Sequence, residues 1–124
     1  MVTGIGSDIT SCARIRAAAE KHGQAFLDHL LTPREQAESR GAVSYYAGRW
    51  AAKEALSKAL GCGIGADCAF TDIEILNNAA GRPEAGLSGA ARKTADRAGA
   101  ARIHLTISHE RDYAIAMAVL ETAD

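Results

Sequence analysis

Residues 47–61 read AGRWAAKEALSKALG, and this stretch decides the fold because it is the centre of the longest segment with helical periodicity. The segment runs from about Ser44 to Leu60 and stops at Gly61. One stripe of the predicted helix is small and apolar, which allows close packing against a sheet or another helix: Gly48, Ala52, Ala55, Leu56, Ala59 and Leu60. A helix turns by about 100° per residue, so a second set of residues shares the opposite face, where we expect chemistry: Ala47, Trp50, Glu54, Lys58 and Gly61.

Shorter elements lie on both sides of this helix in the sequence. A strand is predicted from Val2 to Ile9, with Gly4 and Gly6 marking a bend or a close approach of the backbone. Ser11, Thr32 and Ser88 are expected to cap helices. The expected ranges are helices at 12–22, 24–31 and 33–40, a hairpin at 70–76 and 82–87, a helix at 88–98, and strands at 102–108 and 113–121. This order predicts an α+β fold in which a mainly antiparallel sheet packs against the long central helix.

The composition indicates one small domain, residues 1–124, that gains from association. Hydrophobic residues make up 48% of the chain, but many are alanines and only 5% of residues are aromatic, so each contributes little buried area. A net charge of -1 argues against general nucleic-acid binding. No segment approaches the roughly 20 apolar residues that span a bilayer, and no signal sequence is found, so we expect a cytoplasmic protein without a membrane partner. Cys12, Cys62 and Cys68 are expected to be reduced thiols.

Two carboxylates are the first candidates for chemistry. Asp8 lies where the first strand gives way to a helix, and Glu54 lies on the helix face that also carries Lys58. Hard oxygen ligands from different elements suit Mg²⁺, which completes its shell with water and phosphate, and Lys58 could meet another phosphate oxygen. A structural alternative stays open, in which Asp8 favours a helix start and Glu54 forms a surface ion pair with Lys58 at i,i+4.

Other polar groups allow either phosphate binding or a structural role. Arg49 and Lys53 form an i,i+4 pair on a flank of the long helix, either for phosphate or as solvated side chains. Ser108 and His109 close a strand, and since neighbours on a strand point to opposite faces, they make a poor nucleophile and base pair. The glycines match neither the dinucleotide fingerprint nor the P-loop, so a phosphate site must use other groups.

Taken together, these motifs resemble those of the holo-acyl-carrier-protein synthases, the small trimeric group of 4'-phosphopantetheinyl transferases. The long-helix motif, in which Lys53, Glu54 and Ala55 are followed by Lys58, is highly specific. The matching segments keep the family's order and cover nearly the whole chain. They are residues 4–9, 14–15, 47–61, 72–75, 81–83 and 107–114, reading GIGSDI, RI, AGRWAAKEALSKALG, DIEI, GRP and ISHERDYA.

The resemblance implies transfer of the phosphopantetheine arm from coenzyme A to a serine of apo acyl carrier protein, in fatty acid biosynthesis, with release of adenosine 3',5'-bisphosphate. It implies a catalytic group in which Asp8 and Glu54 bind Mg²⁺ and Lys58 lies beside the pyrophosphate. Glu54, or a metal-bound water that it orients, is our candidate for taking the serine proton. Arg14 and Ile15 match positions that dock the acidic helix of the carrier protein. A homotrimer with sites at subunit interfaces is implied as well. The segments that line the coenzyme A site include Arg49, Lys58, Gly61, Arg82, Pro83, Ser108 and His109.

The chain departs from the family pattern at three positions. Trp50 stands where phenylalanine is usual, Arg82 where lysine is common, and Ser11 where an acid is frequent. The last difference could alter the outer shell of the metal. Two other classes of function stay open: a non-catalytic trimeric protein that binds coenzyme A or a nucleotide, and a metal-dependent hydrolase that uses the same carboxylates with water in place of serine.

Overall fold

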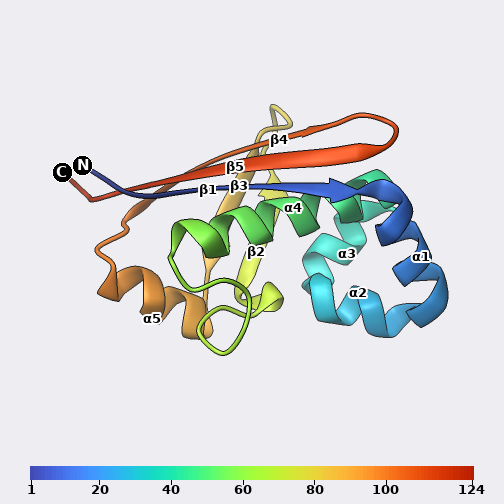
Figure 1. Cartoon of the computed structure of the whole chain (residues 1–124), viewed down its shortest axis with the longest axis horizontal. Helices are drawn as coiled ribbons and strands as arrows, with labels where there is room; N and C mark the ends of the chain where they lie inside the picture. The colour runs from blue at the N-terminus through green and yellow to red at the C-terminus, as the bar shows by residue number, and fades with distance from the viewer.

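The computed structural model describes residues 1–124 as an α+β fold with antiparallel sheets, as predicted (Figure 1). The strands are β1 Val2–Ser11, β2 Ile73–Asn77, β3 Pro83–Leu87, β4 Arg102–His109 and β5 Tyr113–Glu121. The helices are α1 Cys12–His22, α2 Gln24–Leu30, α3 Pro33–Ser39, α4 Val43–Ala59 and α5 Gly89–Arg97, with a 3-10 helix, η1, at Phe70–Asp72. None of the helices has the length and apolar character that a membrane crossing requires.

The larger sheet has the strand order β1-β5-β4, and β2 pairs with β3 in a separate hairpin. Helix α4 runs along one face of the larger sheet, and α1, α2 and α3 gather near the end where β1 leads into α1 (Figure 1). The predicted small and apolar stripe of α4 is buried, but burial extends further around the helix, to Ala47 and Ala51. The reason is that α4 contacts α1 and α2 in addition to the sheet.

The glycines of β1 allow the strand to lie against the backbone of α4. A Cβ atom on Gly4 would lie 2.1 Å from the carbonyl oxygen of Ala59, and one on Gly6 would lie 2.0 Å from that of Ala55. Real Cβ atoms do not approach other atoms this closely, so no side chain fits at either position. The close approach predicted from the two glycines is confirmed, and the partner is α4.

The caps of the short helices explain where the chain turns. The Ser11 hydroxyl accepts a hydrogen bond from the Arg14 amide at 3.3 Å, although β1 extends to Ser11 itself. Thr32 and Glu35 form the predicted capping box. Ser88 is the N-cap residue of α5, as predicted, but its side chain makes no cap hydrogen bond.

The start of β2 differs from the prediction. The strand begins at Ile73, three residues later than predicted, because residues 70–72 form η1. The Asp72 carboxylate accepts hydrogen bonds from the Ala69 amide at 3.1 Å and from the Ala91 amide at 3.2 Å, which holds this turn against α5. The Ser88 amide and hydroxyl both donate to the Asp72 carbonyl, so Ser88 fixes the entry to α5 by another contact.

Candidate active site

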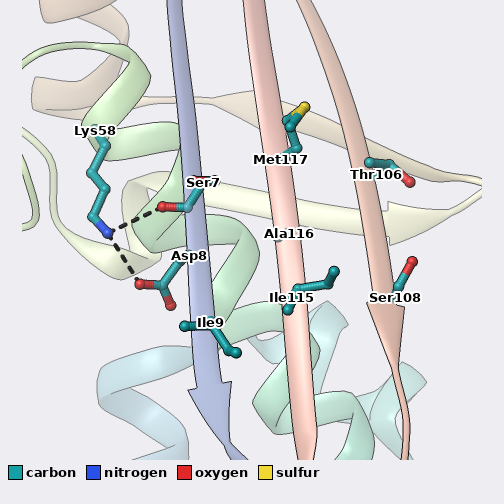
Figure 2. A pocket seen from close by; sticks show the side chains of 9 residues that line it. All are labelled: Ser7, Asp8, Ile9, Lys58, Thr106, Ser108, Ile115, Ala116 and Met117. Atoms are coloured by element: carbon teal, nitrogen blue, oxygen red, sulfur yellow. Dashed lines mark hydrogen bonds and ion pairs between the residues drawn. The ribbon is translucent and has the colours of Figure 1, made fainter.

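Asp8 and Lys58 meet beside β1, where the strand passes the last turn of α4. Lys58 Nζ lies 3.2 Å from Asp8 Oδ1 and donates to the Ser7 carbonyl at 3.1 Å (Figure 2). The Asp8 side chain is 17% exposed and that of Lys58 is 51% exposed. The alternative i,i+4 ion pair with Glu54 is not formed, because Lys58 reaches the Asp8 carboxylate and the Ser7 carbonyl on the neighbouring strand.

Glu54 lies on α4 one turn before Lys58 and lines the same groove as Asp8. Burial raises the pKa of Glu54, the negative charge of Asp8 raises it further, and Lys58 partly opposes this. The two carboxylates are therefore close enough to repel each other, and a shared cation would favour the ionised form of both.

The donor chemistry of this pair fits Mg²⁺. Both candidate ligands are hard carboxylate oxygens, and Mg²⁺ needs only one or two of these from a protein when phosphate and water supply the rest. No cluster of three or more His, Cys, Asp and Glu side chains is present to hold a metal that prefers a full set of protein ligands. Asp8 and Glu54 are the residues that would hold the ion.

A groove of about 350 Å³ opens beside the two carboxylates. The Phe26 and Trp50 rings are stacked in its wall, with centroids 6.1 Å apart, so Trp50 keeps the aromatic character of its position. Arg14 is exposed, as a docking cation needs to be, whereas Ile15 is buried in the core at 4% exposure. The full lining is Asp8, Ile9, Thr10, Arg14, Ile15, Ala18, Phe26, Trp50 and Glu54.

A second hollow, of about 530 Å³, lies on the other side of Asp8 and Lys58. It extends over the outer face of the larger sheet, and Figure 2 shows the Ser108, Ile115 and Met117 side chains on that face. Ser108 therefore lies in one hollow with two members of the proposed catalytic group. Its complete lining is Ser7, Asp8, Ile9, Lys58, Thr106, Ser108, Ile115, Ala116 and Met117.

Arg49 is buried, and it lines neither of the hollows that contain Asp8. Its guanidinium donates to Glu38 Oε2 at 3.2 Å, to Asn77 Oδ1 at 3.0 Å and to the Ile75 carbonyl at 3.0 Å. It also lies over the Tyr45 ring, 4.1 Å from the centroid. These contacts join α4 to α3 and β2, and a role of Arg49 at coenzyme A stays a prediction.

Lys53 corrects the sequence interpretation more strongly. As a phosphate ligand or as a solvated side chain, Lys53 was expected on an accessible flank of the helix. Its side chain is instead fully buried, as is that of Glu35. Lys53 Nζ lies 2.7 Å from Glu35 Oε1 and 2.7 Å from the Leu30 carbonyl, while Glu35 Oε2 accepts from the Ile75 amide. Burial lowers the pKa of Lys53, and Glu35 opposes this. The pair is a structural junction of α2, α3, α4 and β2.

The remaining predicted residues do not line either hollow that contains Asp8. Arg82 and Pro83 line a separate hollow of about 430 Å³ between β3 and β4. Gly61 follows α4 with a φ of 83°, a left-handed conformation that favours glycine. His109 is exposed at the end of β4. One chain thus places Asp8 in one groove with Glu54 and in a second hollow with Lys58 and Ser108, and neither is lined by Gly61, Arg82, Pro83 or His109.

Sequence reasoning missed the Thr10 hydroxyl, which donates to Asp8 Oδ2 at 2.7 Å. The predicted strand ended at Ile9 and so excluded Thr10, whereas β1 continues to Ser11, and residues i and i+2 of a strand share a face. It also missed the Ser7 carbonyl as a partner of Lys58. No side-chain pattern reports a main-chain acceptor, so that contact required the structure.

Comparisons with known proteins agree with this architecture. The family model described as 4'-phosphopantetheinyl transferase superfamily matches residues 4–118. A holo-acyl-carrier-protein synthase of Vibrio atlanticus is 44% identical over 98% of both chains. The crystal structure of such a synthase from Neisseria meningitidis has a TM-score of 0.90 at 42% identity and covers 98% of this chain and 100% of its own. The structure of a holo-acyl-carrier-protein synthase from Helicobacter pylori, in complex with coenzyme A, has a TM-score of 0.87 at 36% identity. It covers 94% of this chain and 99% of its own.

The match of the family model shows that the chain belongs to the 4'-phosphopantetheinyl transferase superfamily, and the fold and the paired carboxylates agree with this. Its full-length relatives place it among the holo-acyl-carrier-protein synthases. It is therefore an enzyme of the phosphopantetheinyl transferase class.

Proposed function

We propose that the chain transfers 4'-phosphopantetheine from coenzyme A to a serine hydroxyl of apo acyl carrier protein, releasing adenosine 3',5'-bisphosphate, in fatty acid biosynthesis in the cytoplasm. The observation that carries the proposal is the convergence of Asp8, Glu54 and Lys58 at the junction of two hollows, in a chain of this family. One hollow can admit coenzyme A, and the other can admit the acceptor serine of the carrier protein.

Asp8 and Glu54 would hold Mg²⁺, which supplies charge neutralisation at a pyrophosphate. Lys58 is half exposed on a flexible stem, so it can leave Asp8 and bind a phosphate oxygen of coenzyme A. Glu54 is the proposed acceptor of the serine proton.

The groove beside Glu54 is the proposed docking site of the carrier protein. Arg14 at its rim presents an exposed cation to an acidic partner, and electrostatic attraction of this kind speeds association. Ile15 is buried, so its contribution is to shape the floor of the groove rather than to make a large contact. Replacing Arg14 by Ala should raise KM for the carrier protein more than it lowers kcat.

We further propose a homotrimer with sites at subunit interfaces. Large apolar side chains stand on the outer face of the larger sheet, including Ile5, Ile9, Ile115 and Met117, whose exposures are 70%, 67%, 49% and 53%. Ile9 and Ile115 are direct partners in the β1–β5 register, so the apolar residues adjoin one another. A patch of this kind is typical of an interaction site. Met117→Glu should reduce the mass in solution from a trimer to a 13.0 kDa protomer in sedimentation equilibrium, whereas Ala79→Glu, in an exposed turn, should not.

The separate hollow at Arg82 and Pro83 supports sites shared between subunits. Within one chain these residues do not line either hollow that contains Asp8. If they bind coenzyme A beside the carboxylates of a neighbouring copy, a mixture of Arg82→Ala and Asp8→Ala chains should regain activity that neither variant has alone. A mixture without regained activity would contradict the shared site.

The decisive experiment is the intact mass of apo acyl carrier protein after incubation with this protein, coenzyme A and Mg²⁺. We expect a gain of one phosphopantetheine, lost with Asp8→Ala, with Glu54→Ala and with a chelator, but kept with Asp96→Ala, which removes an exposed carboxylate on α5. Binding of coenzyme A without transfer to several carrier proteins would favour the non-catalytic binder. Cleavage of coenzyme A without any carrier protein would favour the hydrolase.

A further inference from the structure

Thr10 lies on the inner face of β1, two residues after Asp8. Its side chain is part of the groove lining, and the residue is only 7% exposed. Thr10 Oγ1 donates to Asp8 Oδ2 at 2.7 Å, while Asp8 Oδ1 faces Lys58 Nζ at 3.2 Å. Each oxygen of the Asp8 carboxylate therefore has one protein partner, and the two partners come from different elements.

The backbone and the side chain of Thr10 are both fixed. Thr10 is paired with Ala114 in the β1–β5 register, and the next residue, Ser11, caps α1. A β-branched side chain in a strand has few allowed χ1 values, so the hydroxyl has little freedom to turn away. The Thr10 hydroxyl is thus a hydrogen-bond donor with a fixed orientation, whereas Lys58 has a long, half-exposed side chain that can change its conformation.

We propose that Thr10 is a positioning residue that orients the Asp8 carboxylate for a divalent cation shared with Glu54. This inference rests on the metal site of the proposed function. An ionised carboxylate has about four lone-pair sites, so one bond from Thr10 leaves enough acceptor capacity for a cation. Groups that hydrogen-bond a ligating side chain typically change metal affinity by about 10–100-fold when they are removed.

Two effects of the hydrogen bond oppose each other. The donated hydrogen withdraws some negative charge from the carboxylate and so weakens its attraction for a cation. The same bond removes the rotation of Asp8, which otherwise has to be lost when the cation binds. Orientation dominates here because Thr10 is nearly buried and rigid, so we expect a net gain in affinity from the hydroxyl.

The test compares Thr10→Val, which keeps the shape and removes the hydroxyl, with Thr10→Ser, which keeps the hydroxyl. Thr71→Val is the matched control, since Thr71 is exposed and makes no side-chain hydrogen bond. Electron paramagnetic resonance measures Mn²⁺ binding to each protein without coenzyme A. We expect the Mn²⁺ dissociation constant to rise about tenfold in Thr10→Val and to stay near the original value in Thr10→Ser and Thr71→Val. The Mg²⁺ concentration for half-maximal transfer should rise in parallel, with kcat at saturating Mg²⁺ little changed.

The outcomes separate this inference from the proposed function. Unchanged Mn²⁺ affinity in a folded Thr10→Val protein, while Asp8→Ala abolishes binding, overturns the role of Thr10 and leaves the metal site intact. Unchanged Mn²⁺ affinity in Asp8→Ala overturns the metal site and the inference with it. If Thr10→Val does not fold, Thr10→Ala takes its place, with the same expected rise. A lower melting temperature with unchanged Mn²⁺ affinity identifies a purely structural hydrogen bond and overturns the inference.

Discussion

Replacement of Gly6 by Ala tests whether the contact of β1 with α4 builds the active site. The new Cβ atom would lie 2.0 Å from the Ala55 carbonyl oxygen and 2.7 Å from the Ala59 amide nitrogen. Both neighbours are backbone atoms, so no side chain can rotate to make room. Because real Cβ contacts are essentially never under 3.0 Å, the strand and the helix have to separate by about 1 Å.

This separation has two measurable consequences. Overpacking costs about 1–3 kcal/mol and occasionally more, and a rigid backbone contact belongs at the upper end, so we expect a loss of about 3 kcal/mol. With an unfolding entropy of about 2.1 cal/mol/K per residue, the melting temperature should fall by about 12 °C. Asp8 is two residues away on the same face, and a displacement of about 1 Å at a catalytic group can cost about 100-fold in rate.

The assay combines urea unfolding with phosphopantetheine transfer at equal protein concentration. Gly86→Ala on β3 is the matched control, because a Cβ there meets no atom within 4 Å. It should unfold and react like the original protein. A Gly6→Ala protein that unfolds within about 0.5 kcal/mol of the original, the usual range for a neutral surface change, would refute the reasoning about this contact.

Buried and capping carboxylates predict further effects on stability. Lys53→Met leaves Glu35 buried without its cation, so urea unfolding should show a loss of about 3–5 kcal/mol, and Glu35→Leu combined with it should recover much of this; no recovery would contradict the ion-pair account. Asp72→Ala removes the acceptor of the Ala69 and Ala91 amides and should cost about 1–2 kcal/mol in thermal unfolding, with Asp72→Asn closer to the original. Burial and Asp8 raise the pKa of Glu54, so the folded state binds this proton more tightly than the unfolded state, and stability falls as pH rises from the ordinary value of 4.5 through the raised one. In a chelator, Glu54→Gln should therefore melt above the original protein at pH 8 and lose this advantage near pH 4; equal melting temperatures at both pH values would contradict the shift.

The elements of the fold were predictable because each has a local cause. The long helix follows from its periodicity, the start of α3 from the capping box at Thr32 and Glu35, and the α+β class from the order of elements. The errors arose where a distant group decides the conformation. Residues 70–72 have the alternation of a strand but form a 3-10 turn. The Asp72 carboxylate accepts from the Ala69 amide and from the amide of Ala91, which is distant in the sequence on α5.

The candidate site was predictable in part. The residue types of Asp8, Glu54 and Lys58 indicated a phosphate and metal site, but their meeting was an inference from the resemblance. Which carboxylate pairs with Lys58 could not be read from the spacing, since i,i+4 favoured Glu54 and the structure pairs Lys58 with Asp8. The burial of Lys53 was hidden for the same reason, because Glu35 lies 18 positions away on another helix. The assignment of residues 1–124 to one domain stays a prediction.

The position of the site follows from the spacing of the contacts between β1 and α4. Gly4 faces Ala59 and Gly6 faces Ala55, so a step of two residues along the strand corresponds to four along the helix. The two steps are nearly equal, at about 6.6 Å for the strand and about 6.0 Å for the helix. The next inward residue of β1 is Asp8, and four further residues along α4 lead to Ala51, in the turn that also carries Glu54. The glycines therefore do more than permit close packing: they set the level at which the first side chain of β1 meets the helix, so that a shift in this contact moves one carboxylate past the other.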